Sequence, residues 1–108
     1  MIGTDAIRGY TDTMILYTIL DEPSYGYEMS RVINDLCDGY YIMKETTLYS
    51  SFNRLEKNGF VKSFKGLESQ GKPRTYYEIT EAGKDHYRNK INEWEEIKIT
   101  IPKFIKEI

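Results

Sequence analysis

The 108-residue sequence predicts a mainly α-helical protein with one small antiparallel β-hairpin. Apolar residues recur at steps of three and four in three segments before residue 60 and in one segment after residue 80. Between these segments lie two short runs of β-favouring residues, separated by a polar, glycine-flanked loop. No repeat, low-complexity tract or Pro/Gly/Ser linker interrupts the chain, so we expect one compact unit.

Composition narrows the functional classes. Hydrophobic residues make up 40% of the chain and charged residues 30%, which is typical of a folded protein that faces water. The longest apolar run, residues 14–17, is far shorter than the ~20 residues that cross a bilayer, so no membrane partner is expected. A single cysteine, Cys37, excludes an internal disulfide and fits the reducing cytoplasm. With one histidine and no catalytic constellation, neither an enzyme nor a metal or cofactor is expected.

Two helices are predicted before residue 40. The first covers residues 5–20, because Ile7, Tyr10, Met14 and Tyr17 form one stripe, and it ends before Pro23. The second follows Ser24 as its N-cap and ends near residue 39. Residues 40–43 are too few for a helix and form at most a brief extended piece.

A third helix is predicted over residues 46–58, with Thr46 or Thr47 as its cap. Its inner face carries Leu48, Phe52 and Leu55, and Asn58-Gly59 ends it. Two strands over residues 60–65 and 74–80 follow, joined by the polar loop 66–73.

The last helix begins after Thr80, which can cap it. Its apolar residues follow a heptad pattern: Tyr87, Ile91, Trp94, Ile101, Ile105 and Ile108, with Ile97 beside Lys98 at the missing position. Pro102 is expected to end or kink the helix near Thr100. One helix cannot bury such a stripe alone, so we expect a homodimer whose interface includes Tyr87, Ile91, Trp94, Ile97 and Ile101.

Three helices, a hairpin and a long helix in this order predict a winged helix-turn-helix with a C-terminal extension. The outer face of helix 46–58 carries hydrogen-bonding and cationic side chains, the kinds that contact base edges and phosphates of double-stranded DNA in a major groove. The wing, residues 66–74, adds two cations that can reach the backbone. The predicted DNA contacts are Thr46, Thr47, Tyr49, Ser50, Asn53, Arg54, Lys57, Lys72 and Arg74.

The charge distribution supports the same surface. The net charge is −2, but residues 1–53 sum to −5, whereas residues 54–74 sum to +4. A concentrated basic segment in an acidic chain favours a local phosphate-binding surface. Two alternatives stay open: an ordinary solvated face, and a winged-helix module that binds another protein rather than DNA. Tyr49 can also pack under the helix, and Arg54 can pair near Glu56 or stay solvated.

Several stretches resemble the PadR-like transcriptional regulators. They are residues 8–10 (RGY), 24–28 (SYGYE), 47–49 (TLY), 54–59 (RLEKNG) and 74–83 (RTYYEITEAG). The length is similar to that of the small subgroup with one C-terminal helix. The resemblance implies a homodimeric, cytoplasmic repressor with a DNA-binding part, residues 1–80, and a dimerisation helix, residues 81–108, in one compact unit. The family usually has glycine where Thr46 stands and proline where Ser50 stands, so the base contacts differ from the family pattern.

The small subgroup also suggests an effector site. In it, a tryptophan on the last helix and small residues on the first helix line a cavity at the dimer centre. Here Trp94 would be that tryptophan, and Gly9, Asp12 and Thr13 would share one face of the first helix. A planar aromatic ligand is the expected occupant. The simpler interpretation is that Trp94 only anchors the dimer interface.

Overall fold

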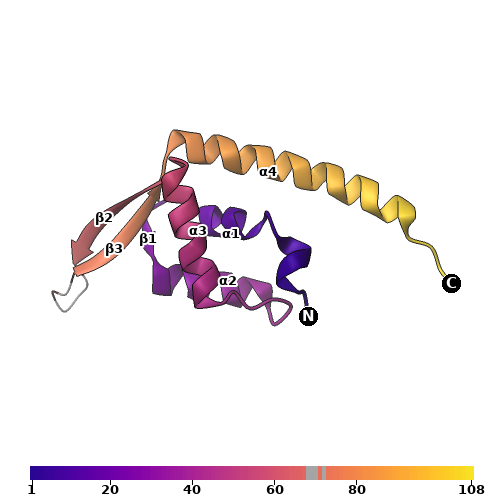
Figure 1. Ribbon diagram of the computed structural model, residues 1–108, viewed down its shortest axis with the longest axis horizontal. Coiled ribbons are helices and arrows are strands. Elements are labelled where there is room, and N and C mark those ends of the chain that lie inside the picture. The colour runs from indigo at the N-terminus through magenta and orange to yellow at the C-terminus, as the bar shows by residue number, and fades with distance from the viewer. Residues whose placement is uncertain (68–70, 72) are drawn as a thin grey trace.

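The computed structural model describes residues 1–67, 71 and 73–108, and it confirms the predicted order of three helices, a hairpin and a long helix (Figure 1). The elements are η1 (Thr4–Ile7), α1 (Thr11–Thr18), β1 (Ser24–Tyr25), α2 (Gly26–Cys37), α3 (Glu45–Lys57), β2 (Val61–Leu67), β3 (Pro73–Ile79), α4 (Glu81–Thr100) and η2 (Ile101–Phe104). Strands β2 and β3 and helix α4 lie within two residues of their predicted bounds.

Helix α1 lies at the centre of the body and packs against α2, α3 and α4. The core consists of the apolar stripes of α1, α2 and α3, together with the loop before α3 and the start of β2. Its buried members are Ile15, Leu16, Ile19, Met29, Ile33, Tyr41, Met43, Leu48, Phe52, Leu55 and Val61. The loop is fixed where the backbone N–H of Met43 donates to the side-chain oxygen of Asn34 at 3.0 Å. The apolar periodicity of the three helices therefore encodes the body.

The sheet has three strands rather than two. Strand β1 pairs antiparallel with β3, Ser24 opposite Tyr77 and Tyr25 opposite Tyr76, and gives the strand order β1-β3-β2. The prediction of Ser24 as the N-cap of the second helix was therefore wrong. Ser24 is in a strand, and the cap position belongs to Tyr25, whose side chain makes no capping hydrogen bond.

Two other helix starts also differ from the predictions. The first helix begins at Thr11 and not at residue 5, because Gly9 adopts a left-handed backbone with φ +95° that interrupts it. Helix α3 begins at Glu45 with Lys44 at the cap, so neither Thr46 nor Thr47 is the capping residue. Thr80, in contrast, caps α4 as predicted, since its hydroxyl accepts from the N–H of Gly83 at 3.0 Å.

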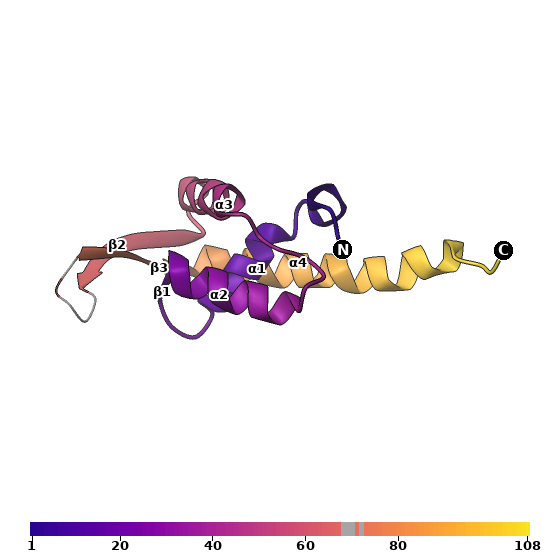
Figure 2. The ribbon, with the colours of Figure 1, turned by 90° about the horizontal axis from the view of Figure 1, so that it is seen from below.

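Helix α4 gives the molecule its long axis. It runs beside α1, and its C-terminal end projects beyond the rest of the body, whereas the wing projects at the opposite end (Figures 1 and 2). The molecule measures 59 × 29 × 21 Å. α4 ends at Thr100 and continues as η2, with Pro102 in its first turn, as predicted. Within the described residues, no helix is both long and apolar enough to span a bilayer.

Candidate nucleic-acid interface

Helix α3 presents a polar row to the solvent. Thr46, Ser50, Asn53 and Lys57 are all exposed, at steps of four, three and four that keep them on one side of the helix. The opposite side carries the buried Leu48, Phe52 and Leu55. Figure 2 shows α3 at one edge of the body. We call these four exposed residues the outer row.

Two buried residues fix the rotation of α3 about its own axis. The ring of Phe52 stacks on Tyr77 of β3, with the ring centroids 4.2 Å apart and the planes inclined by 23°. Ser51, next to it, is fully buried. Because these two residues are held inside, the outer row is held outside.

Tyr49 lies on the flank of α3 that faces α2. Its ring meets Phe52 edge-on at 5.4 Å, and its hydroxyl lies 3.2 Å from the position that a Cβ on Gly26 would occupy. Tyr49 remains half exposed, so the ring packs against the start of α2 while part of it faces the solvent. The sequence did not reveal Gly26 as the residue that makes room for it.

Arg54 lies on the other flank of α3 and pairs with Asp12 of α1. Its Nε donates to Oδ2 at 2.8 Å and its Nη2 to Oδ1 at 2.6 Å. These hydrogen bonds raise the pKa of Arg54 above its usual value. The alternative of a partner near Glu56 was wrong, because Arg54 pairs with Asp12, and Glu56 accepts a hydrogen bond from Ser63 of β2. The sequence analysis did not identify Asp12 as the partner of Arg54, because the two residues are 42 positions apart in the chain.

A polar cleft of about 480 Å³ lies beside this ion pair, between α3 and the segment that leads into α1. Among its walls are Thr46, Thr47, Ser50 and Arg54 from α3 and Gly9 and Asp12 from the first helix region. Four of the predicted DNA contacts therefore share one concave surface. Gly9 and Asp12, which were expected beside Thr13 at an effector site, belong to this surface instead.

The base of the wing is tied to β1. The guanidinium of Arg74 lies over the ring of Tyr25, 3.8 Å from its centroid, and Tyr25 meets Tyr76 edge-on. On the neighbouring strand, Lys65 donates to the hydroxyl of Thr75 at 2.7 Å. Lys72, the other predicted wing contact, lies outside the described residues.

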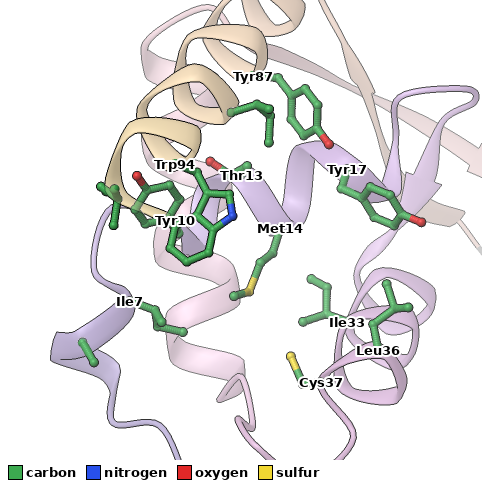
Figure 3. Close-up of a pocket in the computed structure, with 13 residues that line it drawn as sticks. Ile7, Tyr10, Thr13, Met14, Tyr17, Ile33, Leu36, Cys37, Tyr87 and Trp94 are labelled. Atoms are coloured by element: carbon green, nitrogen blue, oxygen red, sulfur yellow. The ribbon is translucent and has the colours of Figure 1, made fainter. Parts of the chain in front are cut away.

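An apolar pocket of about 490 Å³ lies between α1, α2 and α4 (Figure 3). Trp94 points from α4 towards α1, where its ring meets Tyr10 edge-on at 6.1 Å. Tyr10 in turn donates to Glu93 at 2.6 Å, and desolvation of its ring together with this carboxylate raises the pKa of Tyr10 to about 12. Four residues of the predicted dimer interface line the pocket: Tyr87, Ile91, Trp94 and Ile97.

Thr13 contributes a buried polar side chain to the wall of this pocket. Its side chain is buried, and its hydroxyl has no hydrogen-bond partner in the described part of the chain. Of the four residues predicted for an effector site, only Thr13 and Trp94 line the pocket. The prediction that Gly9, Asp12 and Thr13 share one helix face was wrong, since Gly9 precedes the helix.

Comparison with known proteins decides the family. The model of the transcriptional regulator PadR-like family matches residues 15–89, from the second half of α1 to the first half of α4. The chain belongs to the PadR-like family of transcriptional regulators. Members of this family bind DNA, so the winged helix-turn-helix described above is a DNA-binding fold.

Solved structures agree with this membership. A transcriptional regulator from Clostridium thermocellum is 52% identical, with a TM-score of 0.86 over 94% of this chain and 99% of that chain. A PadR family transcription regulator from Clostridium difficile R20291 is 31% identical, with a TM-score of 0.78 over 91% of this chain and 100% of that one. An uncharacterized protein of Lysinibacillus sphaericus is 40% identical over 98% of this chain and 97% of its own length.

The two departures from the usual PadR-like pattern, Thr46 and Ser50, both lie in the outer row. Both are exposed, and both line the polar cleft, so neither disturbs the core of the fold. Their hydroxyls add donors and acceptors to the helix face where the family usually has glycine and proline.

Proposed function

We propose that this chain is a homodimeric repressor that reads a pseudo-palindromic operator with α3 and contacts the DNA backbone with the wing. The observation that carries the proposal is the outer row: four exposed polar or cationic side chains on a helix whose rotation is fixed from behind. Ser and Thr hydroxyls, an Asn amide and a Lys ammonium are groups that hydrogen-bond to base edges and phosphates. Arg54 at the flank and Arg74 at the wing base extend the same surface.

An exposed apolar face supports the dimer. Trp94 and Leu36, both of which line the apolar pocket, keep 45% and 63% of their surface exposed. The projecting end adds Ile101, Phe104 and Ile105, all exposed. Large apolar patches on a monomer usually mark an interface. A second copy that lays its α4 across this face would cover it, and two-fold symmetry would make the coverage mutual.

The apolar pocket supports the proposal of an effector at the dimer centre. Its walls offer the indole of Trp94 for stacking and the unsatisfied hydroxyl of Thr13 for one hydrogen bond. A planar aromatic compound with a single polar group matches this combination, since ring stacking and one placed polar contact are how such pockets orient a ligand. The effector would act between α1 and α4, the helices that the dimer contact also uses.

The proposal is tested by DNA binding of outer-row variants. A random duplex library is selected with the unaltered protein, and the affinity for the most enriched duplex is measured by fluorescence anisotropy. Asn53→Ala is expected to weaken binding by ~1–3 kcal/mol and to relax the preference at its base position. Lys57→Ala is expected to weaken binding to all duplexes alike. It should also reduce by about 1 the slope of the logarithm of the binding constant against the logarithm of the salt concentration.

The matched control is Lys106→Ala, which removes the same charge from the projecting tail. It should leave both the affinity and the salt slope unchanged. Unaltered binding by both outer-row variants would reject α3 as the reading helix. Failure of the unaltered protein to enrich any duplex would reject DNA reading by this chain altogether.

A further inference from the structure

The ion pair between Arg54 and Asp12 is unlike the others in the molecule. Every other ion pair between described residues joins side chains three or four positions apart, whereas this one joins α3 to α1. It is also bidentate, with one hydrogen bond to each carboxylate oxygen, the arrangement in which an arginine is held most firmly by a carboxylate. Asp12 is only 15% exposed, so Arg54 covers it.

The pairing engages one edge of the guanidinium and leaves the other end open. A guanidinium has five N–H groups. Three are engaged, two by Asp12 and one by the hydroxyl of Ser51, to which Nη2 donates at 3.1 Å. The two on Nη1 make no hydrogen bond to the described part of the chain. Arg54 is half exposed and lines the cleft beside Ser50, so its side chain can still meet a further acceptor there.

We propose that Asp12 is a positioning residue for DNA recognition, which holds Arg54 so that its Nη1 end meets one acceptor on the operator. The inference rests on the proposed function, since it names a further part of the same surface. An unrestrained arginine has many rotamers, and ordering it on binding costs free energy. The bond to Asp12 orders it beforehand, while Ser51, fully buried, keeps the guanidinium plane fixed.

The opposite arrangement, in which Asp12 merely withholds Arg54 from DNA, makes a different prediction. Removing an acid raises the positive potential of the surface and strengthens non-specific binding to phosphates in either case. If Asp12 only withheld Arg54, binding to the operator would strengthen as well. If Asp12 positions Arg54, operator binding weakens while non-specific binding does not. The ratio of the two affinities therefore separates the two roles.

The test measures this ratio for Asp12→Asn. The probes are the duplex that the unaltered protein enriches most from a random library and a scrambled duplex of the same composition. Asp12→Asn should bind the enriched duplex about 10-fold more weakly and the scrambled duplex equally or more tightly. The matched control Asp35→Asn removes an acid from the exposed ion pair with Arg31 on α2, and it should leave the ratio unchanged.

A double-mutant cycle distinguishes positioning from a structural role. In an Arg54→Ala background, Asp12→Asn should have no further effect on the ratio, because its only target is gone. Arg54→Lys keeps the charge but removes the planar guanidinium that binds Asp12 with two hydrogen bonds. It should therefore lower the ratio of operator to non-specific affinity as Asp12→Asn does. It also provides the test if Asp12 variants fold poorly, which a thermal melt would reveal.

Three results would overturn the inference: an unchanged ratio in a folded Asp12→Asn variant, tighter binding of this variant to both probes alike, or an equal loss of the ratio with and without Arg54. If the unaltered protein discriminates between the probes and Asp12→Asn does so equally well, the positioning role of Asp12 is rejected and the proposed function is not. If the unaltered protein enriches no duplex, the proposed function fails and the inference fails with it.

Discussion

Thr80 shows how one side chain joins two functional parts of this molecule. Its hydroxyl accepts from the N–H of Gly83 in the first turn of α4 and donates to the carbonyl of Gly59 just after α3. The backbone N–H of Thr80 donates to the carbonyl of Phe60. The segment that follows α3 and the start of α4 are therefore hydrogen-bonded to the same residue.

Gly83 is required at this junction because there is no room for a side chain. A Cβ at this position would overlap the backbone carbonyl of Phe60 and crowd Ile79. Gly83→Ala is therefore expected to lower the free energy of unfolding by ~1–3 kcal/mol, as overpacking does, measured by urea denaturation. Gly3→Ala is the control, since nothing lies within 4 Å of its Cβ. Equal stability of the two variants would contradict the packing seen here.

At the residue scale, the sequence predicts outward-facing positions well and their partners poorly. Periodicity alone places Ser50, Asn53 and Lys57 outside and Leu48 and Phe52 inside, because burial follows the helix repeat. The partner of Arg54 could not be predicted in this way. Asp12 reaches it only through the packing of α1 against α3, and that contact depends on the whole fold.

Helix α1 is the element on which both candidate sites depend. One side of it gives Asp12 to the polar cleft beside α3, and another gives Tyr10, Thr13 and Met14 to the apolar pocket beside α4. A single helix of eight residues therefore separates the surface proposed to contact DNA from the proposed effector pocket. Anything that displaces α1 at the pocket would also displace Asp12.

The pocket makes an element-scale prediction, since walls from three helices surround the only tryptophan of the chain. A panel of planar aromatic cations is titrated against the protein while the fluorescence of Trp94 is followed. At least one is expected to quench it saturably, because stacking on the indole requires direct contact. Thr13→Val should lower the affinity for that compound about tenfold, because the buried hydroxyl is proposed to bind its polar group. Absence of saturable quenching by every compound would remove the support for an effector here.

Short elements are where sequence patterns were least informative. Strand β1 has two residues, too few for any alternation to show, and it exists because β3 offers it a pairing edge. The long heptad pattern of α4 and the alternation of β3 were predicted with nearly correct bounds. Local signals thus predicted the long elements, and tertiary pairing decided the short one.

At the scale of the whole molecule, the parts proposed to contact DNA and those proposed to contact a second copy are separate. The outer row of α3 lies at one edge of the body and the wing at one end, while the end of α4 projects in the opposite direction. A net charge of −2 with a basic segment over residues 54–74 fits this separation, because only one part of the surface attracts phosphate. A two-fold dimer would present α3 twice to one face of a duplex.

Affinity cleavage from α3 itself can show whether this helix lies against DNA twice in each complex. Cys37, the only cysteine, is replaced by serine, and an iron–EDTA group is attached through Asn58→Cys at the end of α3. On the enriched duplex, two clusters of strand cleavage centred about 10–10.5 base pairs apart are predicted. The same group attached through Lys106→Cys should give none. A single cluster, no cleavage from residue 58, or equal cleavage from residue 106 would contradict the account.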